Sequence, residues 1–533
     1  MKTKLQFYIV LPVSVLLAGT AWADNHQGIY FYRMNQPEIA KKIFLLDLSL
    51  NKESAGNCYY LGEIYFSQQK PDSAAFYFNK GLAVDSESAL NKVGQGKLLY
   101  KTDPQGARKL FKEALSKKNA NNLTVLLAVV KALSDNGAPE YLKYLEEAKN
   151  KGMNHPDIYL LEGDIALAAG KPGDAAAKYE EAIHFDNTCT EAYLKYARIY
   201  GNQNPELAIV MLKKLLEIDP NSVPALKELG GLYYAAGKFS SAAEIYDKYV
   251  KLEHAGSPEM IRYALILYYS KDYRYSLRII EPLLSREPDD LVLNRIAMYD
   301  RYELKQYEPA LAAARKVMGK PESELIAGDY ACYGRLLARQ KEWEPARKQL
   351  EKALALDTAA VEIWKDLSGI YYNTDRPDKA LQCYKTYFSK RADAANTADL
   401  FELGRLYLKI GVQADSVKKA SYLLPADSLF VRVAAQAPSS FLAYQMRAQA
   451  NSALDDSEMS AGLAKPYYEK MLELVLPEPE KRRSQIMEGY RYLGVYYLKH
   501  DDNEKSKEYW NKILAIDPED ALATQVMGSL KSK

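Results

Sequence analysis

Cysteine and histidine are scarce in this sequence, and after the first residues no apolar run is long enough to span a membrane. The chain of 533 residues has 4 Cys and 5 His, and no two His stand at the i, i+4 spacing of a helical metal pair. A metal site is therefore not expected. The formal net charge is only +2, which argues against bulk attraction to nucleic acid or to an anionic membrane.

Motifs of the common enzyme classes are also lacking. The GxSxG pattern of a nucleophile elbow does not occur. Residues Val93 to Lys97 resemble a phosphate-binding loop, but the first Gly is missing and Leu98 stands where Ser or Thr would bind magnesium. We interpret Gly94 and Gly96 as small residues where two helices approach. No segment outside the repeats is long enough for a catalytic domain, so the sequence predicts a non-enzymatic protein without a cofactor.

The four cysteines show neither a CxxC motif nor a zinc-like spacing. We interpret Cys58, Cys189, Cys332 and Cys383 as small buried hydrophobic residues. A disulfide between Cys332 and Cys383, in neighbouring repeats, stays open as an alternative if the compartment is oxidising.

The first 23 residues have the pattern of a secretory signal peptide. Lys2 and Lys4 give a positive start, Leu5–Leu17 is mostly apolar, and Ala21-Trp22-Ala23 is a small-x-small cleavage site. The sequence thus predicts a signal peptide over residues 1–23 and an exported, periplasmic and soluble chain that begins at Asp24. A retained N-terminal anchor is the alternative, although the apolar run is short for a stable span.

Proline recurs with a fixed period. Pro37, Pro71, Pro104, Pro139, Pro172 and Pro205 are 33 to 35 residues apart, and five of the six have Ala three residues later. Pro is tolerated in the first turn of a helix, where its missing N–H has no partner within the helix. The small Ala suits a close crossing of two helices.

A second signature lies upstream of these prolines. Leu61-Gly62 is followed by Tyr65, and the same spacing recurs at Leu229, Leu403 and Leu493. With the Ala and Pro positions, this pattern resembles the tetratricopeptide repeat family, in which each unit of 34 residues is a helix–turn–helix. The resemblance covers nearly all of residues 24–533 and implies an all-α, right-handed α-solenoid superhelix of about fourteen units.

The pattern changes near the C-terminus, and we divide the mature chain there. Residues 24–410 form the predicted N-terminal and central array, and residues 411–518 form units with two insertions. One insertion delays the second helix by about ten residues around Ser416–Pro425, and a loop at Leu454–Pro466 is the other. Such insertions map to loops on one face of a solenoid, often the working face, or are inert length variation. Residues 519–533 are predicted to be a capping helix and tail.

In the tetratricopeptide family the first helix of each pair lines a concave groove where ligands bind. On this resemblance one basic residue per repeat faces the groove from Arg198 to Arg405, with Tyr between. The chain has 43 Tyr against 13 Phe, and Arg and Tyr are enriched in interface hot spots. The predicted partner-binding residues are Arg198, Lys227, Tyr234, Arg262, Tyr268, Tyr269, Arg295, Tyr299, Tyr302, Arg335, Lys365, Tyr372 and Arg405.

The seven basic residues of this set are called the basic ladder below, and two interpretations of it are open. Their side chains could grip an extended acidic peptide, because guanidinium groups bind carboxylates well. Alternatively the ladder is a solvated face, whose field Glu228, Asp366 and Glu402 partly cancel. The Lys and Asn combination with which some family members clamp a terminal carboxylate is not found.

A large surface without a recognisable chemical site favours recognition. The sequence therefore predicts a protein–protein interaction scaffold or adaptor of the cell envelope, which binds a partner protein or extended peptide on the concave groove. The partner is expected to be acidic if the ladder binds it, and nucleic acid is not expected. The alternative is a regulatory or assembly subunit of an envelope enzyme or secretion complex.

Overall fold

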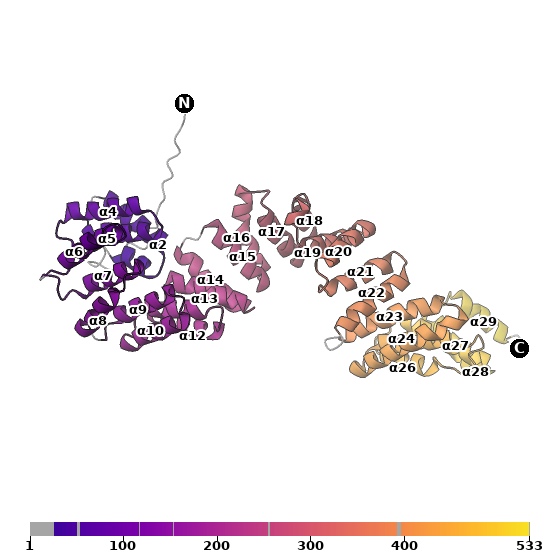
Figure 1. Ribbon diagram of the computed structural model, residues 1–533. Coiled ribbons are helices and arrows are strands. Elements are labelled where there is room, and N and C mark those ends of the chain that lie inside the picture. Colours follow the sequence, from indigo (N-terminus) through magenta and orange to yellow (C-terminus); the bar gives the residue numbers. More distant parts are fainter. Residues whose placement is uncertain are drawn as a thin grey trace, which may run out of the picture. The chain divides into compact units, whose positions relative to one another are not determined.

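The computed structural model describes residues 26–50, 54–116, 118–152, 154–253, 256–391 and 396–531. Within these ranges every regular element is helical, which confirms the predicted all-α fold. Twenty-nine α-helices follow one another in the order expected for fourteen helix–turn–helix units and one final helix (Figure 1). The predicted signal peptide, residues 1–23, lies outside the described residues.

The chain forms two compact units; the first ends at Asp272 and the second begins at Tyr273. The helices of the first unit are α1 (His26–Arg33), α2 (Pro37–Ser49), α3 (Ala55–Ser67), α4 (Pro71–Val84), α5 (Ala89–Leu99), α6 (Pro104–Ala114), α7 (Leu123–Asp135), α8 (Tyr141–Lys151), α9 (Pro156–Ala168), α10 (Pro172–Phe185), α11 (Thr190–Tyr200), α12 (Pro205–Ile218), α13 (Val223–Ala235), α14 (Phe239–Glu253) and α15 (Ser257–Tyr269).

The second unit contains the remaining helices. They are α16 (Tyr273–Arg286), α17 (Leu291–Glu303), α18 (Tyr307–Met318), the 3-10 helix η2 (Glu322–Glu324), α19 (Ala327–Arg339), α20 (Trp343–Leu356), α21 (Glu362–Asn373), α22 (Pro377–Lys390), α23 (Thr397–Gln413), α24 (Ser416–Gln436), α25 (Phe441–Leu454), α26 (Lys465–Val475), α27 (Arg483–Lys499), α28 (Asn503–Ile516) and α29 (Ala521–Lys531).

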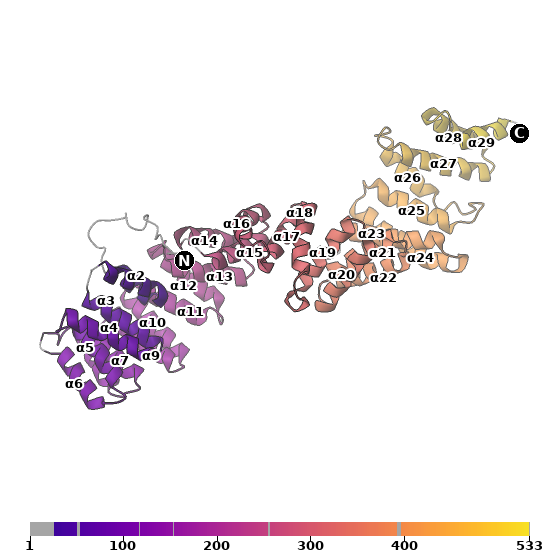
Figure 2. The same ribbon diagram turned by 90° about the horizontal axis from the view of Figure 1, so that it is seen from above.

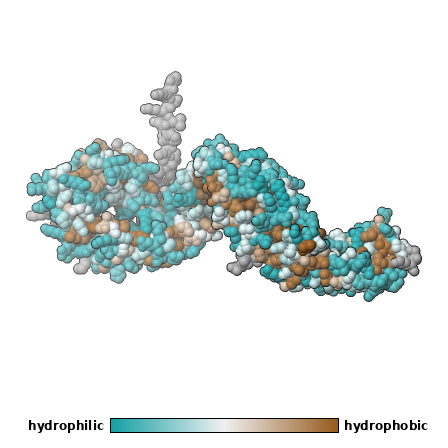
Figure 3. Space-filling model, turned by 45° about the vertical axis from the view of Figure 1, so that its right-hand side comes forward, coloured by the Kyte–Doolittle hydropathy of each residue, from teal (hydrophilic) through white to brown (hydrophobic). Residues whose placement is uncertain are grey.

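Within each unit, consecutive helices pack in antiparallel pairs (Figure 2). Hydrophilic residues cover most of the molecular face seen in Figure 3, with hydrophobic residues gathered in smaller areas. Among the described residues, no helix is both long and apolar enough to cross a membrane.

The turn inside each helix pair explains the period of the prolines. At the end of α3 the backbone of Gln69 is left-handed, with φ +60°, and the N–H of Lys70 donates to the carbonyl of Tyr65 at 3.0 Å. This arrangement satisfies a carbonyl that the end of the helix leaves free. Pro71 then begins α4. As predicted, the alanines that follow the prolines are fully buried at the helix crossing: Ala40, Ala74, Ala107, Ala175 and Ala208.

The Gly of each Leu-Gly pair lies where two helices approach closely. A Cβ added to Gly62 would stand 2.3 Å from the ring of Phe78, and one added to Gly230 would stand 2.5 Å from the ring of Tyr246. Carbon atoms are comfortable only at about 3.5–4.0 Å, so these positions need Gly. The glycines of the phosphate-loop look-alike serve the same purpose, since Gly94 lies against Phe78.

The α23–α24 pair corrects one prediction. Residues Ser416–Pro425 are not a loop insertion, because they form the first turns of α24, which runs from Ser416 to Gln436. Gly404 of α23 faces Phe430 of α24, and these two residues are ten positions further apart than Gly62 and Phe78. The extra residues therefore lengthen both helices of the hairpin. Asp415 begins the longer helix by accepting the N–H groups of Val417 and Lys418 at 3.1 and 3.0 Å.

The second unit ends in a tightly packed region. Ala523 and Leu530 of α29 are buried in one cluster with Trp510 and Ile513 of α28. Between α25 and α26, within the second predicted insertion, the carboxylate of Asp455 accepts the backbone N–H groups of Ala461 and Leu463 at 3.3 and 3.0 Å.

The four cysteines are buried and no disulfide joins Cys332 to Cys383, which agrees with the interpretation of the four as small hydrophobic residues. Burial raises the pKa of the Cys383 thiol to about 11 and that of Cys332 to about 12. Thiolate chemistry at neutral pH is therefore disfavoured at these two positions.

Candidate functional site

The predicted site residues lie on the first helices of consecutive pairs. Successive first helices contact one another along one side of each unit, as α3 with α5 and α5 with α7 in the first unit, and α17 with α19 and α19 with α21 in the second. The predicted residues belong to α11, α13 and α15 in the first unit and to α17, α19, α21 and α23 in the second.

Six of the seven residues of the basic ladder form an ion pair with a described carboxylate. Five of these pairs join one repeat to the next, because the carboxylate stands 30 to 34 residues further along the chain. The pairs are Arg198–Glu228 at 3.0 Å, Lys227–Glu259 at 3.2 Å, Arg295–Asp329 at 2.8 Å, Arg335–Asp366 at 2.7 Å, Lys365–Asp399 at 3.2 Å and, within one helix, Arg405–Glu402 at 3.0 Å. Much of the ladder's charge is thus neutralised inside the protein.

The Arg295–Asp329 pair is the most deeply buried of these. Asp329 is fully buried and accepts hydrogen bonds from Arg295 Nε at 2.8 Å and from the hydroxyl of Tyr299 at 2.8 Å. It also accepts the N–H of Ile326 at 3.0 Å, at the start of α19. Arg295 and Tyr299 therefore hold α17 against α19, and their polar groups are engaged within the fold.

Arg262 is the exception in the ladder. It is exposed on α15 and has no ion-pair partner among the described residues. Tyr234 and Tyr269 are exposed beside it, with ring centroids 5.9 Å apart, and Phe239 stacks on Tyr269 at 4.9 Å. Tyr268 is half-buried next to Tyr269. This end of the first unit combines exposed aromatic rings with an unpaired cation.

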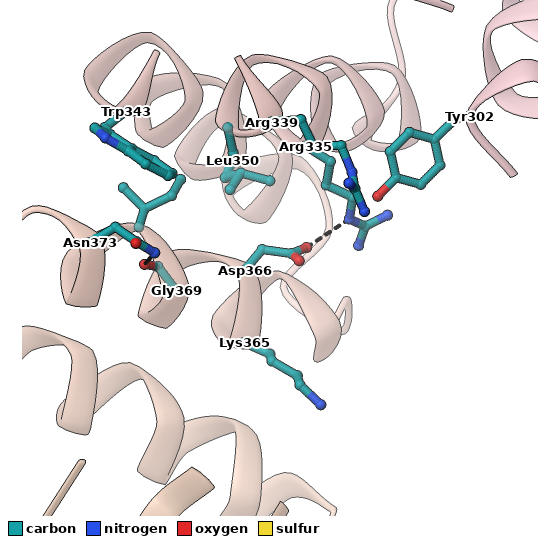
Figure 4. A pocket seen from close by; sticks show the side chains of 11 residues that line it. Tyr302, Arg335, Arg339, Trp343, Leu350, Lys365, Asp366, Gly369 and Asn373 are labelled. Carbon is teal, nitrogen blue, oxygen red and sulfur yellow. Dashed lines mark hydrogen bonds and ion pairs between the residues drawn. The ribbon is translucent and has the colours of Figure 1, made fainter. Parts of the chain in front are cut away.

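The inner side of the second unit is hollowed by a pocket of about 300 Å³ between α17, α19 and α21 (Figure 4). Three predicted residues line it, namely Tyr302, Arg335 and Lys365. In Figure 4 the side chains of Arg335 and Arg339 lie close to Tyr302, and Lys365 extends away from the pocket. Tyr372 and Arg405 stand elsewhere and contact each other, since Arg405 donates to the Tyr372 hydroxyl at 3.1 Å.

The pocket carries an excess of positive charge. Arg335 is bound to Asp366, and burial raises the pKa of that carboxyl although Arg335 acts to lower it. Arg339 has no acidic partner among the described residues, and its guanidinium carbon lies 4.1 Å from the ring centroid of Tyr307. Burial also raises the pKa of the Tyr302 hydroxyl. An incoming carboxylate would therefore meet an unpaired guanidinium and a neutral phenol.

The pocket residues that the sequence reasoning missed include Arg339, Trp343 and Asn373. Arg339 stands one helical turn after Arg335, so the i, i+4 spacing could have identified it. Trp343 begins α20 and Asn373 ends α21, and both line the pocket. The Asn373 amide donates to the carbonyl of Gly369 at 2.8 Å. A search restricted to first helices misses Trp343.

The inner side of the first unit is closed by its own first helix. Arg33 of α1 forms ion pairs with Asp157 of α9 and with Glu191 of α11, the latter at 2.7 Å. The hydroxyl of Tyr30 donates to Asp219 at 2.7 Å. These partners follow α1 by 124 to 189 residues. The first repeat is thereby joined to much later repeats.

An open pocket of about 190 Å³ lies beside α1. It is lined by Tyr32, Tyr59 and Tyr60 together with Arg33 and its acidic partners. Close to it lies a buried charged group in which the ammonium of Lys97 contacts Glu63 at 2.8 Å and Asp135 at 2.7 Å. The charges of this region are paired with one another, so the pocket of the second unit is the better candidate for a ligand.

Comparison with known proteins identifies the type of repeat. Residues 200–260 match the family model described as tetratricopeptide repeat. The peroxisomal targeting signal receptor of Komagataella phaffii is 27% identical over 119 residues, which are 22% of this chain and 21% of that protein. The chain thus spans about a fifth of the length of this curated relative.

Two bacterial structures are also similar. The C-terminal part of a TPR repeat-containing protein from Cytophaga hutchinsonii has 26% identity, with a TM-score of 0.40, over 50% of this chain and 98% of that chain. A tetratricopeptide repeat protein from Parabacteroides merdae has 24% identity and a TM-score of 0.29 over 47% of this chain and 99% of that chain. Together with the helix pairs described above, the family match supports the assignment of these repeats to the tetratricopeptide type.

Proposed function

We propose that this chain is an adaptor of the cell envelope that binds an acidic segment of another protein on the inner side of its second unit. The observation that carries this proposal is the pocket between α17, α19 and α21, which is lined by Arg339, an arginine without an acidic partner among the described residues. Aromatic residues and arginine are the types that contribute most to protein interfaces. Tyr302 lies beside the arginines and Trp343 lies at the other side of the pocket (Figure 4), and both supply apolar surface for the residues next to a bound carboxylate.

The setting of this function follows from the N-terminus. Lys2, Lys4, the apolar run Leu5–Leu17 and the Ala21-Trp22-Ala23 site favour export and cleavage. We expect mass analysis of the native protein to find Asp24 at its N-terminus. A native protein that retains Met1 would contradict the proposed setting, while leaving the binding proposal to its own test.

The partner can be identified from the pocket itself. A photo-crosslinking amino acid in place of Asn373, which lines the pocket, should capture the bound protein in intact cells, and mass spectrometry of the product names it. The same amino acid at Ala355, which is exposed on α20, is the matched control and should not capture that protein.

Two pocket variants should then weaken binding of the captured partner. Arg339→Glu places a negative charge against the acidic segment, and we expect a loss of at least about tenfold in affinity. Gly369→Leu fills the pocket, and a Cβ at Gly369 meets no atom within 4 Å, so helix α21 should tolerate the larger side chain. Fluorescence anisotropy with a labelled partner segment measures both losses.

Two controls separate binding from folding. Ala355→Leu adds a similar volume on α20, and Lys214→Glu reverses an exposed charge on α12. Both should bind as wild type does, and circular dichroism should show equal helix content in all variants. Equal affinity of Arg339→Glu, Gly369→Leu and wild type would refute binding in this pocket.

A further inference from the structure

The lengthened helix α24 carries a line of exposed aliphatic side chains. Val417, Leu424 and Val431 are 88%, 59% and 41% exposed. They are seven residues apart, which is close to two helical turns, so they lie along one side of the helix over about 21 Å. Ala420 and Ala435 are exposed on the same side. We call Val417, Ala420, Leu424, Val431 and Ala435 the α24 stripe.

The stripe is not part of the core that holds α24 in place. That core uses the opposite side of the helix, where Leu423, Ala426 and Phe430 are buried with Leu408 of α23 and Ala450 of α25. No described residue covers the stripe. Single exposed aliphatic residues are common and need no explanation, but a spacing of seven residues is that of a seam between two helices.

One edge of the stripe is basic. Lys418 and Arg432 are exposed along it. The nearby carboxylates are already engaged: Asp415 caps the helix and contacts Lys418 at 3.7 Å, and Asp427 accepts Arg447 Nε at 2.9 Å. A helix that covers the stripe would therefore gain from acidic side chains along the edge that faces Lys418 and Arg432.

We propose that the α24 stripe binds an amphipathic helix of another protein, with apolar residues in a seven-residue repeat and acidic residues beside them. The small side chains of Ala420 and Ala435 allow that helix to approach closely. This surface is separate from the pocket between α17, α19 and α21, and the proposal does not depend on that pocket.

Two other occupants fit less well. A second copy of this chain, packed symmetrically and antiparallel about Leu424, would bring Lys418 of one copy near Arg432 of the other, and like charges disfavour that contact. A membrane surface is favoured by helices with Trp, Phe and many Lys residues, whereas the stripe is narrow and consists of Val, Leu and Ala.

The test uses the full chain and designed peptides of about three heptads. The first peptide has Leu and Ala at its apolar positions and Glu beside them, and its comparator has Lys in place of Glu. Fluorescence anisotropy should show that the Glu peptide binds at least about tenfold more tightly than the Lys peptide. Leu424→Glu should weaken binding of the Glu peptide at least about tenfold, since it puts a carboxylate into an apolar seam.

The matched control is Leu356→Glu, because Leu356 at the end of α20 is 60% exposed and Leu424 is 59% exposed. This variant should bind the Glu peptide as wild type does. Failure of wild type to bind the Glu peptide, or equal binding by Leu424→Glu, would overturn the proposal. So would self-association, or adsorption to anionic phosphatidylglycerol vesicles, that Leu424→Glu abolishes. Arg339→Glu should leave peptide binding unchanged, which keeps this test independent of the pocket.

Discussion

Replacing Arg295 by Ala is expected to lower the free energy of unfolding of the second unit by about 3 kcal/mol. The variant leaves the carboxylate of Asp329, which is fully buried, without its cation. The hydroxyl of Tyr299 and the N–H of Ile326 still donate to it, so the effect should stay at the low end for a broken buried ion pair. Urea denaturation, with hydrogen exchange of α17 and α19, measures the loss.

The control for this prediction is Arg262→Ala. Arg262 is exposed and has no ion-pair partner among the described residues, so a change within about 0.5 kcal/mol is expected. Adding Asp329→Asn to Arg295→Ala removes the uncompensated charge and should restore part of the stability. Equal stability of Arg295→Ala and Arg262→Ala would mean that the buried pair does not hold the repeats together. If Arg295→Ala is destabilised as expected, a charge reversal at Arg295 would also disturb the fold and would not be a valid test of ligand binding.

Replacing Lys97 by Met should destabilise the first unit by about 3–5 kcal/mol. Lys97 and Glu63 are 2% and 4% exposed, and Met keeps most of the volume of the lysine stem while removing the ammonium. Glu63 and Asp135 would then face each other without a cation. Thermal and urea unfolding at pH 7 test the size of the loss, and Lys109→Met, which removes an exposed lysine of α6, is the control.

The pH dependence gives this prediction a second measurement. Burial acts to raise the pKa of Asp135, but Lys97 and Lys131 outweigh it and hold the pKa below its ordinary value of 3.8. Stability from this group is therefore present above about pH 4 and is lost as pH falls through the lowered pKa. Burial acts to lower the pKa of Lys97, but the two carboxylates raise it above 10.5, so its contribution is lost only as pH rises past that raised value.

Between about pH 4 and the raised pKa of Lys97, the titration of Asp135 and Lys97 should change the free energy of unfolding of the wild type only a little. In Lys97→Met, protonation relieves the uncompensated negative charge. The difference in free energy of unfolding between wild type and Lys97→Met should therefore become smaller as pH falls from 7 to 5. A deficit that stays constant over this range would contradict the assignment of the loss to buried charge.

The helix pairs could be predicted from the sequence because their causes are local. Pro71 and Ala74, or Gly62 and Tyr65, act within a few residues, and the contact between Gly62 and Phe78 closes within one hairpin. Ser416–Pro425 misled the same reasoning, since ten added residues fit a loop and a longer hairpin equally well in sequence. Only the contact between Gly404 and Phe430 distinguishes the two.

The candidate site was harder to predict because its energetics depend on pairs between repeats. Glu228 and Asp366 were recognised as neighbours that weaken the field, and they are bound to Arg198 and Arg335. Arg262 and Arg339 have no such partner among the described residues. Predicting this from the sequence requires knowledge of the register between successive helices. Trp343 lines the pocket from α20, which is the second helix of its pair. A sequence pattern that considers only the first helix of each pair cannot predict this.

The contacts of α1 also set an order for folding during synthesis. Asp157, Glu191 and Asp219 are made 124 to 189 residues after Arg33 and Tyr30. At about 5–20 residues per second, the ribosome needs roughly 10–40 s to supply the last of them after Tyr30. Repeats of a solenoid otherwise need only their neighbours. The first repeat to be synthesised therefore completes its contacts only after α12 (Pro205–Ile218) has been made, and until then Arg33 and Tyr30 remain accessible to chaperones and proteases.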